Sequence, residues 1–339
     1  MKLNISPIFL YMIAGIISCS KPVLDPMIPT PDNPYSLGRV GNKRDVHTST
    51  ASGLMLMGGS TDVDAAMKWM IERAGGGDFV IIRVSGGTGY NDYLYEMGGL
   101  NSVETLRINT PEAANEEKVF QTLKNAEALF IAGGDQSQYI QLWEGSKVEE
   151  AIQYLIHEKK IPVGGTSAGC AVMGEFVYTG EKGSVTGVEA LADPFDERMT
   201  VQRSTLVNHP LLQNTITDQH FSQRERQGRL MGFLARLKEQ SDKSPLRAIA
   251  VDEKTALVID ENGVASQMGQ ANVFLFEEAF SDQDPEVLQP GMPLSWVLGN
   301  QAVKVKILGP EKKETLQINS WDFDWDTFWF VEKGILRSN

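Results

Sequence analysis

The sequence predicts an α/β protein with a three-layer, doubly wound and mostly parallel sheet, followed by a β-rich C-terminal extension. Two observations lead to this fold class. Short apolar runs alternate with longer amphipathic stretches between residues 53 and 163, and glycine-containing turns follow several of the apolar runs. Strands that alternate with helices pair in parallel, so we expect functional side chains at the carboxyl ends of these strands.

Apolar periodicity places the individual elements. Residues 53–58 are expected to form a strand that ends in a glycine pair, and residues 62–74 a helix with one apolar face. The other expected strands of this part are 79–84, 128–132 and 161–163, and the other expected helices are 116–125 and 148–157. In the β-rich part, strands are expected at 248–251, 255–259 and 273–276, with a hairpin turn at 261–263.

The first 48 residues differ in composition from the rest. Residues 1–18 have the layout of a signal peptide, with a lysine, a ~10-residue apolar run and a small residue before Cys19. The segment Ile16-Ile17-Ser18-Cys19 resembles the lipobox of bacterial lipoproteins, which implies a lipid on Cys19 and export to a periplasmic or cell-surface membrane. An ordinary secretory signal is the alternative. Residues 19–48 carry five prolines between positions 22 and 34 and are expected to form an extended tether.

Composition excludes several function classes. The chain has 339 residues, with 44 acidic against 31 basic side chains and a formal net charge of −13, which argues against a nucleic-acid partner. Two cysteines cannot build a disulfide framework or a cysteine-rich zinc site. We expect no metal and no organic cofactor. Only four histidines are available as a catalytic base.

The strongest motif is Gly165-Thr166-Ser167-Ala168-Gly169, which stands between an expected strand and a helix-compatible run. A Gly-x-Ser-x-Gly turn in this position is typical of a nucleophile elbow, where the turn exposes the serine hydroxyl. Small residues can also fill such a turn for packing alone, but the flanking strand and helix favour a catalytic Ser167. Cys170 is expected to be a buried helix residue and not a reactive thiol.

Among the histidines, His220 has the surroundings of a base. It stands close to Asp218 and is followed by Arg224, Arg226 and Arg229. Arginines of this kind can bind substrate carboxylates through paired hydrogen bonds, whereas a solvated basic segment is an equally open interpretation.

Three features together resemble the cyanophycinases of peptidase family S51, to which dipeptidase E is related. They are the elbow, Gly133-Gly134-Asp135-Gln136 and the histidine-arginine run at 218–229. The resemblance covers about residues 53–260. It implies a flavodoxin-like fold related to class I glutamine amidotransferases, with Ser167 as nucleophile and His220 as base. It also implies an acid after the serine, for which Glu181 is the best match and Glu189 the competitor.

The same resemblance implies further roles. Gly134 and Ala168 would supply the oxyanion-hole N–H groups. The implied substrate-binding residues are Gln136, Thr215, Asp218, Arg224, Arg226 and Arg229. On this basis the chain divides into a signal peptide (1–18), a lipidated tether (19–48), a catalytic domain (49–260) and a β-rich extension packed on it (261–339).

The implied activity is hydrolysis of the aspartyl backbone of cyanophycin, or of related β-aspartyl peptides, with release of β-Asp-Arg dipeptides. A lipid-anchored peptide-binding protein with the same fold and lost turnover is the alternative from a different class. In either case the partner is a peptide or polymer, and the membrane is contacted only through the N-terminal lipid. The sequence leaves the oligomeric state, including a homodimer, open.

Overall fold

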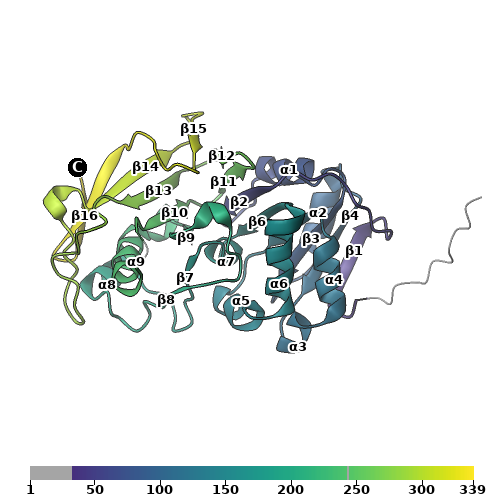
Figure 1. Cartoon of the computed structure of the whole chain (residues 1–339), viewed down its shortest axis with the longest axis horizontal. Helices are drawn as coiled ribbons and strands as arrows, with labels where there is room; N and C mark the ends of the chain where they lie inside the picture. The colour runs from purple at the N-terminus through teal and green to yellow at the C-terminus, as the bar shows by residue number, and fades with distance from the viewer. Residues whose placement is uncertain (1–32, 243) are drawn as a thin grey trace, which may run out of the picture. The chain divides into compact units, whose positions relative to one another are not determined.

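Two sheets organise the fold, and Figure 1 shows them following one another along the longest axis. The structure, a computed structural model, describes residues 33–242 and 244–339. The predicted signal peptide, Cys19 and the tether up to residue 32 lie outside the described residues.

The first sheet has nine strands in the order β1-β4-β3-β5-β6-β2-β11-β12-β15. Its centre is parallel, as the alternation of strands and helices predicts. The parallel strands are β4 (Ser102–Arg107), β3 (Asp78–Arg83), β5 (Ala128–Ile131), β6 (Pro162–Thr166) and β2 (Gly53–Met57). The doubly wound sheet predicted from the sequence is therefore confirmed.

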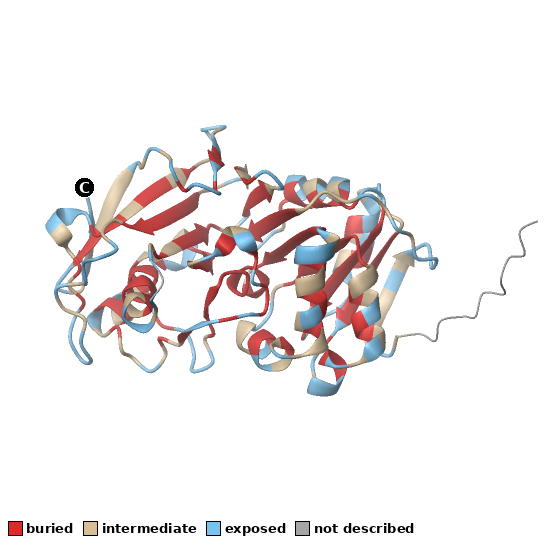
Figure 2. Cartoon of the chain, viewed as in Figure 1, coloured by how far each residue is buried: buried red, intermediate tan, exposed pale blue. Residues whose placement is uncertain are grey.

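Helices cover both faces of this parallel centre. α1 (Asp64–Arg73) and α2 (Gly89–Glu96) pack on one face, and α4 (Glu117–Asn125), α5 (Gln136–Trp143) and α6 (Lys147–Tyr154) contribute to the core of the other. Because side chains of a strand alternate between faces, Phe79 and Ile81 of β3 join the α1 side whereas Val80 and Ile82 join the α4 side. Figure 2 shows most strands buried and the helices exposed along one side.

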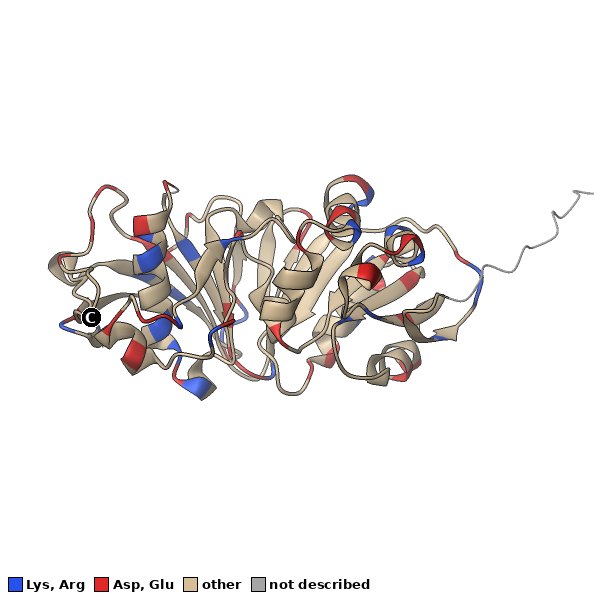
Figure 3. Cartoon of the chain, turned by 90° about the horizontal axis from the view of Figure 1, so that it is seen from below, with Lys and Arg blue, Asp and Glu red and all other residues tan. Residues whose placement is uncertain are grey.

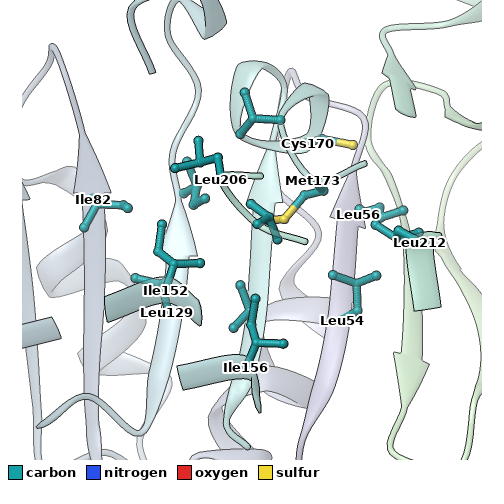
Figure 4. Close-up of a cluster of buried hydrophobic side chains, with 14 of the residues drawn as sticks. Leu54, Leu56, Ile82, Leu129, Ile152, Ile156, Cys170, Met173, Leu206 and Leu212 are labelled. Carbon is teal, nitrogen blue, oxygen red and sulfur yellow. The ribbon is translucent and has the colours of Figure 1, made fainter. Parts of the chain in front are cut away.

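The core beneath the elbow is apolar. Figure 4 shows Cys170 and Met173, from the segment that follows Ser167, close to Leu56 of β2 and Leu206. Cys170 is fully buried, and burial raises the pKa of its thiol. The expectation that Cys170 is a packing residue is confirmed. The strands β2, β5 and β6 contain no charged residue, and Figure 3 shows the charged residues mainly on the surrounding helices and loops.

One part of the segment that was expected to be an extended tether forms a strand of the first sheet. Residues Ser36–Gly41 form β1, which pairs antiparallel with β4 at the edge of the sheet. The last of the clustered prolines is Pro34, so the residues after it keep the N–H groups that strand pairing requires. Two short elements, α3 (Pro111–Ala114) and a π-helical turn at Leu155–Lys159, complete this part.

The second sheet has eight strands in the order β17-β16-β14-β13-β10-β9-β7-β8. The strands are β7 (Phe176–Tyr178), β8 (Val201–Arg203), β9 (Thr215–Gln219), β10 (Arg247–Val251), β13 (Val273–Glu278), β14 (Val303–Leu308), β16 (Thr327–Glu332) and β17 (Ile335–Ser338). α8 (Gly187–Ala192) and α9 (Gln227–Gln240) share its core. β9 runs parallel to β10, so their carboxyl ends meet at one edge.

The C-terminal residues contribute to both sheets. β11 (Thr255–Asp260) pairs with β2, and β12 (Val264–Gly269) and β15 (Thr315–Gln317) extend the first sheet beyond it. The predicted hairpin turn at 261–263 joins β11 to β12. Trp321 is buried, and Phe323 and Trp325 pack against the same core, as expected for an aromatic cluster used in packing. Within the described part of the chain, no helix has both the length and the apolar character needed to cross a bilayer.

Candidate active site

Ser167 lies at the sharp turn between β6 and the short helix α7 (Ala168–Ala171). Its backbone has φ +52° and ψ −118°, an unfavourable conformation for a residue with a Cβ. The Ser167 N–H donates to the carbonyl of Met57 at 3.1 Å, which holds the strained turn against β2. The elbow predicted from the sequence therefore has the expected strand-turn-helix geometry.

His220 stands directly after β9 and faces the serine. Its Nε2 lies 2.8 Å from Ser167 Oγ, a hydrogen-bond distance, and its side chain is only 7% exposed. The His220 N–H donates to the carbonyl of Gly58 at 2.9 Å. Two residues that are 53 positions apart in the chain are thus brought together at the carboxyl ends of two strands from different sheets.

The other imidazole nitrogen contacts an acid that the sequence analysis missed. His220 Nδ1 lies 2.7 Å from Oε1 of Glu253, in the turn between β10 and β11. The expectation of Glu181, or else Glu189, in this position is corrected. Glu181 is exposed and lines a separate surface groove, whereas Glu189 closes a capping box at the start of α8 and pairs with Arg198.

A signal for Glu253 was present in the sequence. It follows the expected strand 248–251 by two residues, and β10 is the parallel neighbour of the strand that carries His220. Acids at the carboxyl ends of adjacent parallel strands lie at the same edge of a sheet. The choice of Glu181 rested on the family resemblance, which implies an acid shortly after the serine.

The backbone carbonyls of three consecutive residues at the end of β2 hold Ser167, His220 and Glu253 next to one another. Those of Met57, Gly58 and Gly59 accept from the N–H groups of Ser167, His220 and Lys254, the last being the neighbour of Glu253. Gly59 has φ +96°, and a Cβ there would lie 2.5 Å from His220 Nε2. A glycine is therefore required at this position on two grounds, its backbone conformation and the space that the imidazole occupies.

The electrostatics suit a neutral imidazole. Burial lowers the pKa of His220 from its ordinary value, while the hydrogen bond that its Nδ1–H donates to Glu253 acts in the opposite direction. The same hydrogen bond, accepted from His220, lowers the pKa of the Glu253 carboxyl, which keeps it ionised. With Glu253 accepting from Nδ1–H, the lone pair of Nε2 faces the hydroxyl of Ser167, the arrangement a general base requires.

Backbone N–H groups converge near the serine. Ala168 is the first residue of α7, where N–H groups have no intrahelical acceptor. The loop after β5 passes close by, because a Cβ on Gly133 would lie 3.9 Å from Ser167 Oγ. The oxyanion-hole role expected for Gly134, the next residue, and for Ala168 stays a prediction.

Two of the expected substrate-binding residues pair with each other instead. Arg229 donates to both carboxylate oxygens of Asp218, at 3.0 and 2.5 Å, and both side chains are 2% exposed. The Arg229 guanidinium also lies over the rings of Tyr178 and Phe233. Asp218 and Arg229 are therefore enclosed within the fold, and their expected direct contact with substrate is corrected.

The remaining two arginines of the run differ in exposure. Arg226 is 8% exposed and donates to the Gln219 carbonyl at 2.5 Å; burial lowers its pKa to about 10, which leaves it charged at neutral pH. Arg224 is exposed, and its charge acts on both His220 and Glu253. Of the three arginines, Arg224 is the one placed to meet a substrate.

Thr215 and Gln136, the two other residues expected to bind substrate, lie in different parts of the fold. Thr215 begins β9, is fully buried and donates to the Gln213 carbonyl. His220 is five positions further along, about 16 Å in an extended chain, so Thr215 lies at the far end of the strand and its expected role in binding is corrected. Gln136 starts α5 beside the Gly133–Gly134 loop and reaches the Tyr178 carbonyl.

A groove of about 530 Å³ lies along α5, beginning one residue after Gln136. Its acidic side chains are Glu144, Glu149 and Glu181, none of which forms an ion pair with a described lysine or arginine. The groove therefore favours a cationic group. His, Cys, Asp and Glu side chains of residues 33–242 and 244–339 form no group of three at metal-binding distance.

Comparisons with known proteins agree with this geometry. A cyanophycinase of Trichormus variabilis is 27% identical over 184 residues, which are 54% of this chain and 56% of that protein. A cyanophycinase of Synechococcus elongatus is 24% identical over 242 residues, 68% of this chain and 70% of its own length. The chain thus spans little more than half the length of the first of these relatives.

A solved structure shares the fold. The crystal structure of a peptidase from an acI-B1 Actinobacterium superposes with a TM-score of 0.51 at 15% identity, covering 79% of this chain and 98% of that one. The family model named "Peptidase family S51" matches residues 90–267, just over half of the chain, and this range includes Ser167, His220 and Glu253. The strained serine, its histidine partner and the family match lead to one conclusion: this chain belongs to peptidase family S51.

Proposed function

We propose that the protein is a cyanophycinase-like peptidase that hydrolyses the aspartyl backbone of cyanophycin, or of related β-aspartyl peptides, and releases β-Asp-Arg dipeptides. The observation that carries the proposal is the chain of two hydrogen bonds from Ser167 Oγ through His220 to Glu253, at 2.8 and 2.7 Å. Similarity to cyanophycinases supports the choice of substrate.

The proposed reaction is acyl transfer through the serine. His220 Nε2 takes the proton of Ser167 Oγ as the oxygen attacks the carbonyl carbon of the scissile amide. The N–H groups of Gly134 and Ala168 stabilise the oxyanion, and the ionised Glu253 stabilises the imidazolium. The imidazolium then gives its proton to the leaving amine. Water, deprotonated by the same imidazole, releases the acyl group and restores Ser167.

The charges around the serine support a substrate that carries both signs. Each unit of cyanophycin has an arginine joined to an aspartate side chain, so it presents a free carboxylate and a guanidinium. Arg224 is exposed beside His220 and can bind a carboxylate. The acidic groove along α5, lined by Glu144, Glu149 and Glu181, suits the guanidinium, a role for which Asp218 is unavailable.

The test is release of soluble product from the insoluble polymer. Purified protein is incubated with cyanophycin granules, and soluble β-Asp-Arg is quantified by liquid chromatography and mass spectrometry. The proposal expects β-Asp-Arg as the main product. Hydrolysis of short isoaspartyl peptides without release of β-Asp-Arg from the polymer would show that the substrates are small β-aspartyl peptides and not cyanophycin. Inactivity toward both would refute the proposed function.

Intact hydrogen bonds between Ser167, His220 and Glu253 favour turnover over the alternative of a binding protein with a decayed site. The N-terminal pattern supports one further part of the proposal, export and lipid attachment at Cys19. Expression of the full chain in a bacterial host tests it. Wild-type protein should partition with membranes, and Cys19→Ser should not be lipidated; equal partitioning of the two would contradict lipid attachment at this cysteine.

A further inference from the structure

The glycine-rich segment 85–89 has no part in the reaction described so far, yet it is built around one arginine. Arg83, the last residue of β3, turns back on this loop. Its Nε donates to the Ser85 carbonyl at 2.5 Å and its Nη1 to the Gly87 carbonyl at 2.9 Å. Gly86 has φ +100°, and a Cβ there would lie 2.5 Å from the guanidinium carbon. The loop thus wraps the guanidinium and holds it at a fixed place.

That place is the same edge of the sheet as the catalytic serine. β3 neighbours β5, which leads into the Gly133–Gly134 loop, and β5 neighbours β6, which leads into Ser167. Two strand spacings of about 4.8 Å put the end of β3 about 10 Å from the end of β6. Arg83 also acts on the phenol of Tyr139, whose hydroxyl donates to the Ala132 carbonyl beneath Gly134. An extended peptide covers about 10 Å in three residues.

The guanidinium of Arg83 has no acidic partner among residues 33–242 and 244–339. Its Nε and Nη1 donate to backbone carbonyls, and no carboxylate of these residues lies within ion-pair distance of it. The side chain is half-buried and not free in solvent. A guanidinium held in this way keeps N–H groups for a planar, anionic acceptor. Arg226 and Arg229, by contrast, are engaged in the buried cluster around Asp218.

We propose that Arg83 is a specificity-determining residue that binds a substrate carboxylate two or three residues away from the scissile bond, across the oxyanion loop from Ser167. The proposal rests on the proposed peptidase function and adds to it a second carboxylate contact, separate from Arg224. It also gives the glycine-rich loop a purpose, because the glycines at positions 86 and 87 let the loop fold tightly around the guanidinium and leave its outer edge open to substrate.

The test compares two peptides and three variants. One peptide is a short cyanophycin-type oligomer with free arginine carboxylates, and the other carries the same groups as primary amides. The variants are Arg83→Gln, Arg83→Lys and the matched control Arg107→Gln, which removes an exposed arginine in register with Arg83 on the neighbouring strand β4. Thermal unfolding is recorded for each protein.

The expected result is selective. Arg83→Gln should lower kcat/KM for the carboxylate peptide roughly 10- to 100-fold, mainly through KM, because one charge-assisted contact is lost. Activity toward the amide peptide should change less than about twofold. Arg83→Lys should keep part of the preference for the carboxylate peptide, and Arg107→Gln should behave as wild type.

Three results would overturn the inference. Equal losses toward both peptides in Arg83→Gln would make Arg83 a structural support of the loop, and an unchanged kcat/KM for the carboxylate peptide would remove it from substrate binding. A wild-type protein inactive toward both peptides would overturn the proposed function and, with it, the proposed binding of a substrate carboxylate by Arg83. The first two failures appear only in the variants and the third in the wild type, so they are distinguishable.

Discussion

Glu253 Oε1 lies 2.7 Å from His220 Nδ1, although the two residues are 33 positions apart in the chain. Their closeness follows from β9 and β10, which run parallel and end at the same edge. The carboxylate fixes the tautomer of the imidazole, because it requires a proton on Nδ1 and so leaves Nε2 free to accept from Ser167. The geometry thus assigns a different role to each of the two ring nitrogens.

Replacement of this acid tests the assignment. Glu253→Gln should lower kcat roughly 100- to 10,000-fold, because an amide can turn its N–H toward Nδ1 and favour the wrong tautomer. Glu181→Gln is the comparison variant: Glu181 lines the groove proposed for the guanidinium and is not the partner of His220, so its loss should act on KM and keep kcat within about twofold. Steady-state hydrolysis of a β-aspartyl peptide provides the measurement. A large loss of kcat in Glu181→Gln together with a small one in Glu253→Gln would instead make Glu181 the acid that acts on His220.

The pH dependence follows from the lowered pKa of His220. Protonated imidazole cannot accept from Ser167, so kcat/KM should fall as pH decreases through the His220 pKa. Because burial, assisted by Arg224 and Arg226, lowers that pKa, the acidic limb should have its midpoint below 6.5. Glu253 raises the pKa, so Glu253→Gln should move the midpoint to still lower pH. Profiles from about pH 4 to 9 at constant ionic strength test both statements, and a wild-type midpoint above 6.5 would contradict them.

Gly59 tests the space beside the imidazole. In Gly59→Ala the new Cβ meets the His220 ring, and the backbone conformation at φ +96° is unfavourable for alanine. We expect a loss of kcat of roughly 100-fold or more, with a smaller effect on KM, because a displaced base affects the chemical step. Gly291→Ala is the control, since Gly291 has a similarly positive φ of +72° and a Cβ there meets nothing within 4 Å. Equal kcat values for the two variants would show that Gly59 does not position His220.

The buried pair of Asp218 and Arg229 should contribute to stability and not directly to binding. Asp218→Asn leaves the buried Arg229 without its counter-charge and should lower the free energy of unfolding by about 3–5 kcal/mol. Glu239→Gln removes an exposed carboxylate that pairs with the half-buried Arg236 and should cost less than about 1 kcal/mol. Urea unfolding followed by tryptophan fluorescence compares the two. A wild-type unfolding midpoint in Asp218→Asn, together with a raised KM, would return Asp218 to the substrate site.

Local patterns predicted the catalytic elbow and its surroundings well. The run at 53–58 became β2, and Gly-x-Ser-x-Gly took the strained turn after β6, because both depend on neighbours in the sequence. Glu253 could not be found in this way, since its contact with His220 depends on the parallel pairing of β9 and β10. Sequence spacing directed attention to Glu181, which lies elsewhere.

Ion pairs between buried side chains were the other feature that could not be predicted from the sequence. Asp218 and Arg229 are residue types that often bind charged substrates, and only their mutual burial shows that each neutralises the charge of the other. The region 261–339 was expected as a β-rich extension packed on the catalytic domain, and its strands continue both sheets, β12 beside β11 and β13 beside β10. Such pairings are set by long-range contacts that apolar periodicity does not encode.

Turnover by Ser167→Ala tests the central claim most directly. The variant removes only the attacking oxygen, and alanine suits a position where small residues pack, so the fold should remain intact. We predict that wild type releases β-Asp-Arg from cyanophycin while Ser167→Ala, with an unchanged thermal unfolding temperature, releases none above the background. Release by Ser167→Ala at a rate near that of wild type would contradict acyl transfer through Ser167.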